Sequence, residues 1–272
     1  MGNLLVPRGR WNRHPDISDV VRNIPVQDLR FQDPAGDTGL PRPSRHRLWW
    51  ALWLTLGYLA QVGLRLYLSR LQTVPLASPD ESAYLITARV LAHAGAPADF
   101  SFGTLYQGGY PLLLVPVYWF TANSVTVYHA ALVINAAVNA LLMPLAYVAF
   151  RRLHARRWVA YGGAAATALV PEAVLYTQYA LADAIFPVLV LAWLLCVHSW
   201  LTARTWRSSL PAAAGSALLA GYAYAVHPRG LVIVIGFALV AVAATVFRMT
   251  RAWSLAVAGL VLDGRVGHPA AG

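Results

Sequence analysis

Long apolar segments joined by short, arginine-bearing connections constrain this chain more than any other feature. A helix needs about twenty apolar residues to cross the ~30 Å hydrocarbon core of a bilayer. Six segments reach or approach that length, whereas a seventh, 252–262, rises only about 16 Å. We therefore predict an all-α multi-pass transmembrane protein with six full spans and a partial seventh. The predicted full spans are residues 48–68, 125–150, 158–176, 181–201, 210–226 and 230–247.

The arginines predict how such a protein lies in its membrane. All 21 basic residues are arginine. With a cytoplasmic N-terminus, sixteen of them fall in cytoplasmic segments or tails, and three fall in outer loops: Arg70, Arg89 and Arg229. Basic residues are enriched on the cytoplasmic side of membrane proteins, so we expect a plasma-membrane protein in this orientation. The net charge of +10 does not indicate nucleic acid, because the arginines punctuate the apolar segments instead of gathering on one soluble domain.

Composition divides the chain into three parts. Residues 1–47 are polar and basic and are predicted to form a disordered cytoplasmic tail. Residues 48–262 form the transmembrane module, and 263–272 form a polar C-terminal tail. Only 12% of residues are charged, against about 25% in a soluble domain, so a separate soluble domain is not expected within these boundaries.

The first outer loop contains the most informative stretch. Residues 78–81 read Ser-Pro-Asp-Glu, which is typical of a helix start with Ser78 at the N-cap and Glu81 three residues on. Gly95 suits the position just past a helix end. The pattern predicts a juxtamembrane helix over 79–94 that lies at the membrane surface. Its acidic N-terminal end, Asp80 and Glu81, would then face the outside.

Acids, tyrosines, a histidine and arginines collect in the predicted outer segments. Ionisable groups beside lipid are costly, so they suggest function. A carboxylate pair there could activate a hydroxyl nucleophile or hold a divalent cation, and an arginine could hold a phosphate. These groups favour a reaction between a lipid-phosphate donor and an acceptor outside the cytoplasm.

Each group also has a simpler structural interpretation. Asp80 and Glu81 can cap a helix and interact with its dipole. Arg89 and Arg229 can bind lipid head groups, so membrane lipid is an expected partner in either case. Asp183 can be a packed, hydrogen-bonded residue.

Several motifs carry a family resemblance. An arginine near the end of the first span is followed by Pro-Asp-Glu-Ser-Ala-Tyr at 79–84, Ala-Arg-x-Leu at 88–91 and Gly-Tyr-Pro-Leu-Leu-Leu at 109–114. Residues 182–186 (Ala-Asp-Ala-Ile-Phe) and 227–230 (His-Pro-Arg-Gly) match later motifs, with Asp where Glu is common and with the usual Arg-Pro order altered. Over about 48–262 the chain resembles the GT-C-fold membrane glycosyltransferases, which include protein O-mannosyltransferases and aminoarabinose transferases. Such enzymes continue beyond seven spans, so the chain is expected to be a truncated form.

The resemblance implies sugar transfer from a polyprenyl-phosphate donor to an acceptor on the outer face of the plasma membrane. Asp80 would be the general base, and Glu81 would orient the acceptor or help to hold a divalent cation. Arg89 or Arg229 would stabilise the departing phosphate. The sugar, the acceptor, the metal dependence and the oligomeric state stay open, and a non-catalytic membrane protein, such as a transporter fragment or assembly partner, is the alternative. The implied substrate-binding residues are Tyr84, Arg89, Tyr106, Gly109, Tyr110, Asp183, His227 and Arg229.

Overall fold

The computed structural model describes residues 45–77, 79–95 and 107–246. The chain divides into two compact units, 1–44 and 45–272, and every described residue belongs to the second. All secondary structure in the described ranges is helical, which confirms the predicted all-α class. The helices are α2 (Arg45–Ser69), α3 (Asp80–Leu91), α4 (Pro111–Tyr118), α5 (Ser124–Ala140), α6 (Leu142–Arg152), α7 (Arg157–Ala168), α8 (Pro171–Tyr176), the short 3-10 helix η2 (Ala182–Ala184), α9 (Phe186–Thr202), α10 (Trp206–Val226) and α11 (Gly230–Val246).

Two helical stretches in the described part are long and apolar enough to cross a membrane. One is Ser124–Arg152, which joins α5 to α6, and the other is α10. Helices α9 and α11 are apolar but have 17 residues each. The six-span arrangement therefore stays a prediction. The predicted tails, and the partial seventh span at 252–262, lie outside the described residues.

Apolar side chains also cover outward faces of these helices. On α11, Val232, Leu239 and Val242 are 72%, 65% and 61% exposed. Soluble monomers rarely present such continuous apolar surface to water. The exposed faces therefore fit association with a membrane.

The predicted third span, 158–176, is wrong as a single helix. Helix α7 ends at Ala168, and α8 begins at Pro171. Proline is tolerated in the first turn of a helix but cannot continue one from before it. The twelve residues of α7 rise only about 18 Å, well short of the hydrocarbon core.

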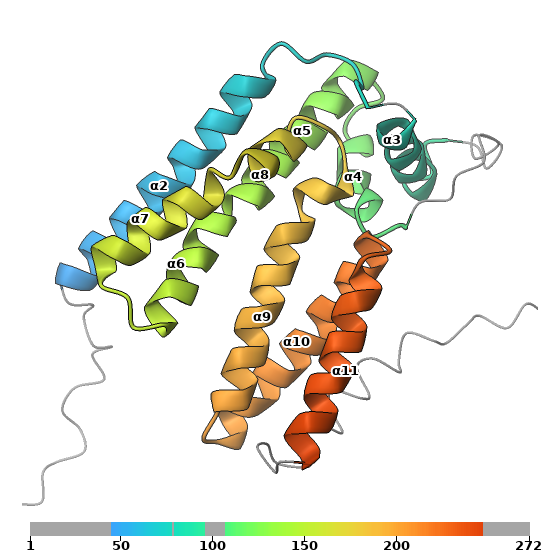
Figure 1. Cartoon of the computed structure of the whole chain (residues 1–272). Coiled ribbons are helices and arrows are strands. Elements are labelled where there is room, and N and C mark those ends of the chain that lie inside the picture. Colours follow the sequence, from blue (N-terminus) through green and yellow to red (C-terminus); the bar gives the residue numbers. More distant parts are fainter. Residues whose placement is uncertain (1–44, 78, 96–106, 247–272) are drawn as a thin grey trace, which may run out of the picture. The chain divides into compact units, whose positions relative to one another are not determined.

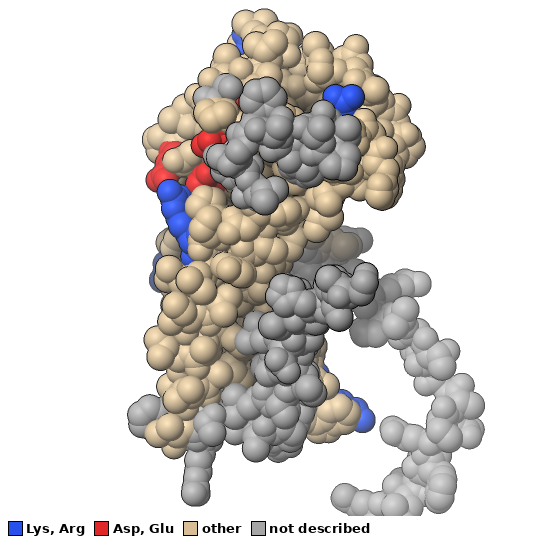
Figure 2. All heavy atoms as spheres, turned by 90° about the vertical axis from the view of Figure 1, so that its right-hand side faces the viewer, with Lys and Arg blue, Asp and Glu red and all other residues tan. Residues whose placement is uncertain are grey.

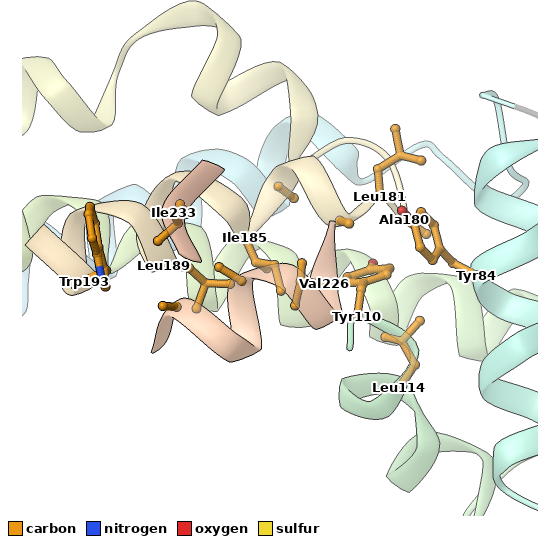
Figure 3. Close-up of a cluster of buried hydrophobic side chains, with 14 of the residues drawn as sticks. Tyr84, Tyr110, Leu114, Ala180, Leu181, Ile185, Leu189, Trp193, Val226 and Ile233 are labelled. Atoms are coloured by element: carbon orange, nitrogen blue, oxygen red, sulfur yellow. The ribbon is translucent and has the colours of Figure 1, made fainter. Parts of the chain in front are cut away.

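The helices pack in two neighbouring groups with α3 and α4 at one end of them (Figure 1). Helix α2 packs on α5, α6 and α7, while α10 packs on both α9 and α11. A large buried cluster joins α3, α4 and α5 to the α9–α11 group through residues 180–185 (Figure 3). A smaller cluster lies between α6, α7 and α9. The segment 180–185 is therefore where the two groups meet.

The predicted juxtamembrane helix exists as α3, with different ends. Its buried residues are Glu81, Tyr84, Thr87 and Ala88, and Leu91 is 42% exposed. Pro79 occupies the N-cap position and makes no side-chain cap, and Ser78, the expected cap, lies outside the described residues. The left-handed residue after the helix is His93, with φ 57°, instead of the predicted Gly95.

Candidate functional site

Most of the described arginines lie at the opposite end of the helices from the described acids. The start of α2 and the α6–α7 and α9–α10 connections lie at the lower end in Figure 1, and the latter two carry the arginines of 151–157 and 204–207. The rings of Trp50 and Trp158 meet edge to face, with centroids 4.7 Å apart, and join the starts of α2 and α7 there. The four described acids lie on α3, α8 and η2, at the upper end: Asp80, Glu81, Glu172 and Asp183. Segments predicted to share one side of a membrane thus lie at one end of the bundle.

Glu81 is fully buried and accepts four hydrogen bonds. Its Oε1 accepts from the backbone N–H groups of Leu76 and Ala77, at 2.8 and 2.6 Å. Its Oε2 accepts from the Tyr128 hydroxyl at 2.9 Å and from the Ala180 N–H at 2.7 Å. A carboxylate offers about four lone-pair directions, so both oxygens are fully used. Glu81 thus connects the start of α3 to α5 and to a segment about a hundred residues later.

That later segment, 179–184, is also held by one face of α5. Asn135 donates from Nδ2 to the Tyr179 carbonyl at 2.7 Å, and Asn139 donates from Nδ2 to the Ala184 carbonyl at 2.6 Å. Tyr128, Asn135 and Asn139 are spaced by seven and four residues, so they share a helix face. Together with Glu81 they fix the backbone on both sides of Asp183.

Tyr84 and Tyr110 are buried beside this segment. Their rings meet edge to face with centroids 5.1 Å apart, and both lie in the cluster that includes Ala180 (Figure 3). Burial raises the pKa of the Tyr110 hydroxyl, and the neighbouring Asn135 side chain partly opposes the rise. Both tyrosines therefore act in packing, away from solvent.

Gly109 lies very close to the backbone at the end of α10. Its N–H donates to the Ala225 carbonyl at 2.7 Å, and its carbonyl accepts from the Tyr222 hydroxyl at 3.0 Å. A Cβ atom at Gly109 would lie 2.5 Å from the Ala225 carbonyl carbon and oxygen, so only glycine fits without a shift of backbone. The Gly-Tyr-Pro step therefore docks the start of α4 onto the end of α10.

Asp80 and Arg89, the charged ends of α3, are both exposed. Asp80 is the first residue of α3. Arg89 donates from Nε to the Ala94 carbonyl at 2.9 Å, just past the helix end. Nine residues of helix separate the two side chains, which amounts to about 13 Å along the axis and nearly opposite faces. The structure does not bring them together, and Tyr106 lies outside the described residues.

Asp183 forms a second charged group with residues from the α10–α11 turn. Its Oδ1 lies 3.1 Å from Arg229 Nη1 and 3.9 Å from His227 Nε2. Burial lowers the pKa of His227, which Asp183 opposes and Arg229 reinforces. On the face drawn in Figure 2, acidic atoms gather directly beside basic ones in the upper part, and the surface below is almost uncharged apart from its lower edge.

A pocket of about 280 Å³ opens beside the Asp183–Arg229 pair. Its charged wall also includes Glu172, and its apolar wall comes from α6, α8 and the start of α9. Arg229 keeps 69% of its side chain exposed, so most of its five N–H donors can reach a ligand. The pocket thus combines an apolar wall with one guanidinium and two carboxylates. Its lining residues are Leu142, Thr167, Val170, Glu172, Ala173, Tyr176, Asp183, Phe186, Pro187 and Arg229.

Arg65 is the arginine near the end of the first predicted span, on α2. Its side chain is fully buried. The guanidinium donates to Asn139 Oδ1 at 2.8 and 3.1 Å, to Gln61 Oε1 at 2.6 Å and to the Ala168 carbonyl at 2.8 Å. It therefore clamps α2 to α5 and to the end of α7.

Sequence reasoning missed Tyr128, Asn135 and Asn139, and a signal for them existed. Polar residues at 128, 135 and 139 form one stripe on a largely apolar helix, and buried polar groups in such a helix need partners inside the fold. Within the described residues, no group of three or more metal-ligating side chains of His, Cys, Asp and Glu is assembled.

Comparisons with models of protein families, with curated proteins and with solved structures give no match for this chain. The resemblance to membrane glycosyltransferases therefore stays a hypothesis.

Proposed function

We propose that this chain transfers a sugar from a polyprenyl-phosphate carrier to a hydroxyl acceptor at the outer face of the plasma membrane. One observation carries the proposal. An exposed carboxylate, Asp80, stands at the acid-bearing end of an apolar helical bundle, and the start of its helix is fixed by a buried neighbour, Glu81. A reaction between a membrane-held donor and a water-soluble acceptor needs such a group at the bundle end. The motif resemblance supports the same chemistry.

In the proposed reaction, Asp80 takes the proton from the acceptor hydroxyl as the oxygen forms a bond to the anomeric carbon. The bond from that carbon to the phosphate oxygen breaks, and the electron pair leaves with the polyprenyl phosphate. A phosphate is already a good leaving group, so the main demands are positioning and charge stabilisation. Because Glu81 uses both oxygens in hydrogen bonds, no step of this reaction needs a cation held by Asp80 and Glu81.

Arg229 is the better of the two candidate arginines for the departing phosphate. Arg89 lies nearly opposite Asp80 on α3, and its Nε is engaged at the helix end. Arg229 is largely exposed at the mouth of the pocket, on a turn that pairs with Asp183. Segment 179–184, which carries Asp183, also bonds to Glu81, next to Asp80. The apolar pocket wall suits the lipid end of a donor.

The proposal is tested by following transfer from radiolabelled polyprenyl-phosphate sugars in membranes that contain the protein. A general base contributes about 10²–10⁴-fold in rate, so Asp80→Asn should lose at least about 99% of transfer. A charge that only favours the helix dipole contributes about 0.3–1 kcal/mol, or at most about a fivefold effect. Arg204→Gln, at the opposite end of the bundle, is the control and should keep the wild-type rate.

Two outcomes would contradict the proposal. If Asp80→Asn keeps more than about a fifth of the wild-type rate at equal protein level, Asp80 is a helix-end charge and no base. If the wild-type protein transfers none of the sugars tested, the non-catalytic alternative is favoured.

A further inference from the structure

Glu81 joins the two segments that carry the proposed reactive groups. Its Oε1 holds the backbone of residues 76–77, which lead into Asp80. Its Oε2 holds the N–H of Ala180, three residues before Asp183, and Asp183 pairs with Arg229. A single side chain therefore touches the backbone beside both charged groups.

The same segment is held from its other side by α5. The Asn135 amide group binds the Tyr179 carbonyl, and the Asn139 amide group binds the Ala184 carbonyl. The Tyr128 hydroxyl binds Glu81 itself. In an apolar interior each such bond is costly to lose, because the group left behind has no water to replace its partner.

We infer that Glu81 is a positioning residue, which sets where the Asp183–Arg229 pair lies relative to Asp80. Its catalytic consequence rests on the proposed transfer, whereas its geometric role does not. All four partners of Glu81 donate hydrogen bonds, and three of them are backbone N–H groups that cannot turn into acceptors. Only a group that accepts at both ends, and that is long enough to reach both segments, satisfies them.

Glu81→Gln should break the bond to segment 179–184 and keep the bonds at the start of α3. A glutamine has one accepting oxygen and one amide group that only donates. If the oxygen faces Leu76 and Ala77, it keeps two backbone bonds, and the Tyr128 hydroxyl can rotate to accept from the amide. The Ala180 N–H then has no acceptor. The variant should therefore release segment 179–184 while the start of α3 stays in place.

The test is hydrogen–deuterium exchange, measured by mass spectrometry on the full chain in detergent micelles. Wild-type protein should protect the Ala180 amide. In Glu81→Gln, peptides over 177–184 should exchange at least about tenfold faster, which is the scale of one lost buried hydrogen bond. Peptides from α10 and α11 should be unchanged. Tyr128→Phe is the matched control, because it removes one donor and keeps the carboxylate and all three backbone bonds.

Two results of the exchange measurement would overturn the inference. Unchanged exchange over 177–184 in Glu81→Gln would show that Glu81 does not hold this segment. A uniform increase over all helices would show that Glu81 contributes only to overall stability. If Glu81→Gln does not fold, Glu81→Asp, which keeps the charge but shortens the side chain by one methylene group, must show the same local increase over 177–184.

The transfer assay gives a second, separate readout. In active protein, Glu81→Gln should lower kcat by about tenfold or more with little change in the KM for the donor, since displaced reacting groups affect the chemical step more than binding. If the wild-type protein transfers sugar but exchange over 177–184 is the same in Glu81→Gln as in the wild type, the positioning role alone is rejected. If neither the wild type nor the variant transfers sugar but Glu81→Gln shows the expected faster exchange, the proposed function alone is rejected.

Discussion

Replacing Arg65 with methionine should destabilise the protein strongly. The side chain is fully buried, and its guanidinium is the hydrogen-bond donor to Gln61 Oε1, Asn139 Oδ1 and the Ala168 carbonyl. Methionine fills similar space but donates nothing, so three buried acceptors lose a partner. Each unsatisfied buried acceptor costs about 1–3 kcal/mol, which gives a total of about 3–9 kcal/mol.

Part of that loss is offset, because methionine has no charge to desolvate. We therefore expect a net loss near the lower end, about 3 kcal/mol, in the free energy of unfolding. For a domain of this size, 1 kcal/mol shifts the midpoint of thermal unfolding by about 2–4 °C. The midpoint of Arg65→Met should thus fall by about 6–12 °C.

The measurement is thermal unfolding in detergent, followed by circular dichroism or tryptophan fluorescence. Arg70→Met is the matched control, since Arg70 lies just past the end of α2 and is exposed, and its guanidinium contacts the carbonyl and the ring of the nearby Tyr67. Its effect should stay within about 0.5 kcal/mol. A midpoint for Arg65→Met equal to or above that of the wild type would refute the clamp, since the acceptors would then be satisfied without it.

Three further predictions concern other parts of the structure. Gly109→Ala places a Cβ 2.5 Å from backbone atoms and should lower stability by about 1–3 kcal/mol, whereas Gly108→Ala, which meets open space, should be nearly neutral in the same unfolding assay. Burial lowers the folded-state pKa of His227 below 6.5. Its contribution to the free energy of unfolding is therefore present above about pH 6.5 and is lost as the pH falls through the lowered value. The stability of His227→Gln should accordingly change less than that of the wild type between about pH 7 and 5. Reporter fusions at Ala98 and Arg204 should show activity typical of the outside and of the cytoplasm, respectively, and cytoplasmic activity at Ala98 would reject the orientation and the site with it.

Much of the helical layout followed from apolar patterning. The segments around α5–α6, α10 and α11 were predicted within a few residues, because a long apolar run in a membrane has few alternatives to a helix. The prediction over 158–176 failed because it continued one helix across Pro171, where α8 begins. The charge separation was also predicted, since it depends only on which connections carry arginine.

The roles of individual charged residues could not be predicted in the same way. Asp80 and Glu81 are neighbours with similar chemistry, yet one is exposed and the other fully buried. A helix turns by about 100° per residue, so adjacent side chains face different surroundings, and which face is inward depends on what packs against it. Glu81 can be buried because hydrogen-bond donors reach its carboxylate. Two of these donors, the Tyr128 hydroxyl and the Ala180 N–H, lie far along the chain.

The sequence by itself determined an all-helical chain with apolar segments, in which most of the described arginines lie on connections at the end opposite the described acids. The tertiary structure alone decided that Glu81 and Arg65 are interior hydrogen-bonding centres, and that Asp183, His227 and Arg229 form one group. The physical reason is that burying a charge is acceptable only where enough partners converge on it. Those partners come from α5, α7 and segment 179–184, and only folding brings them together.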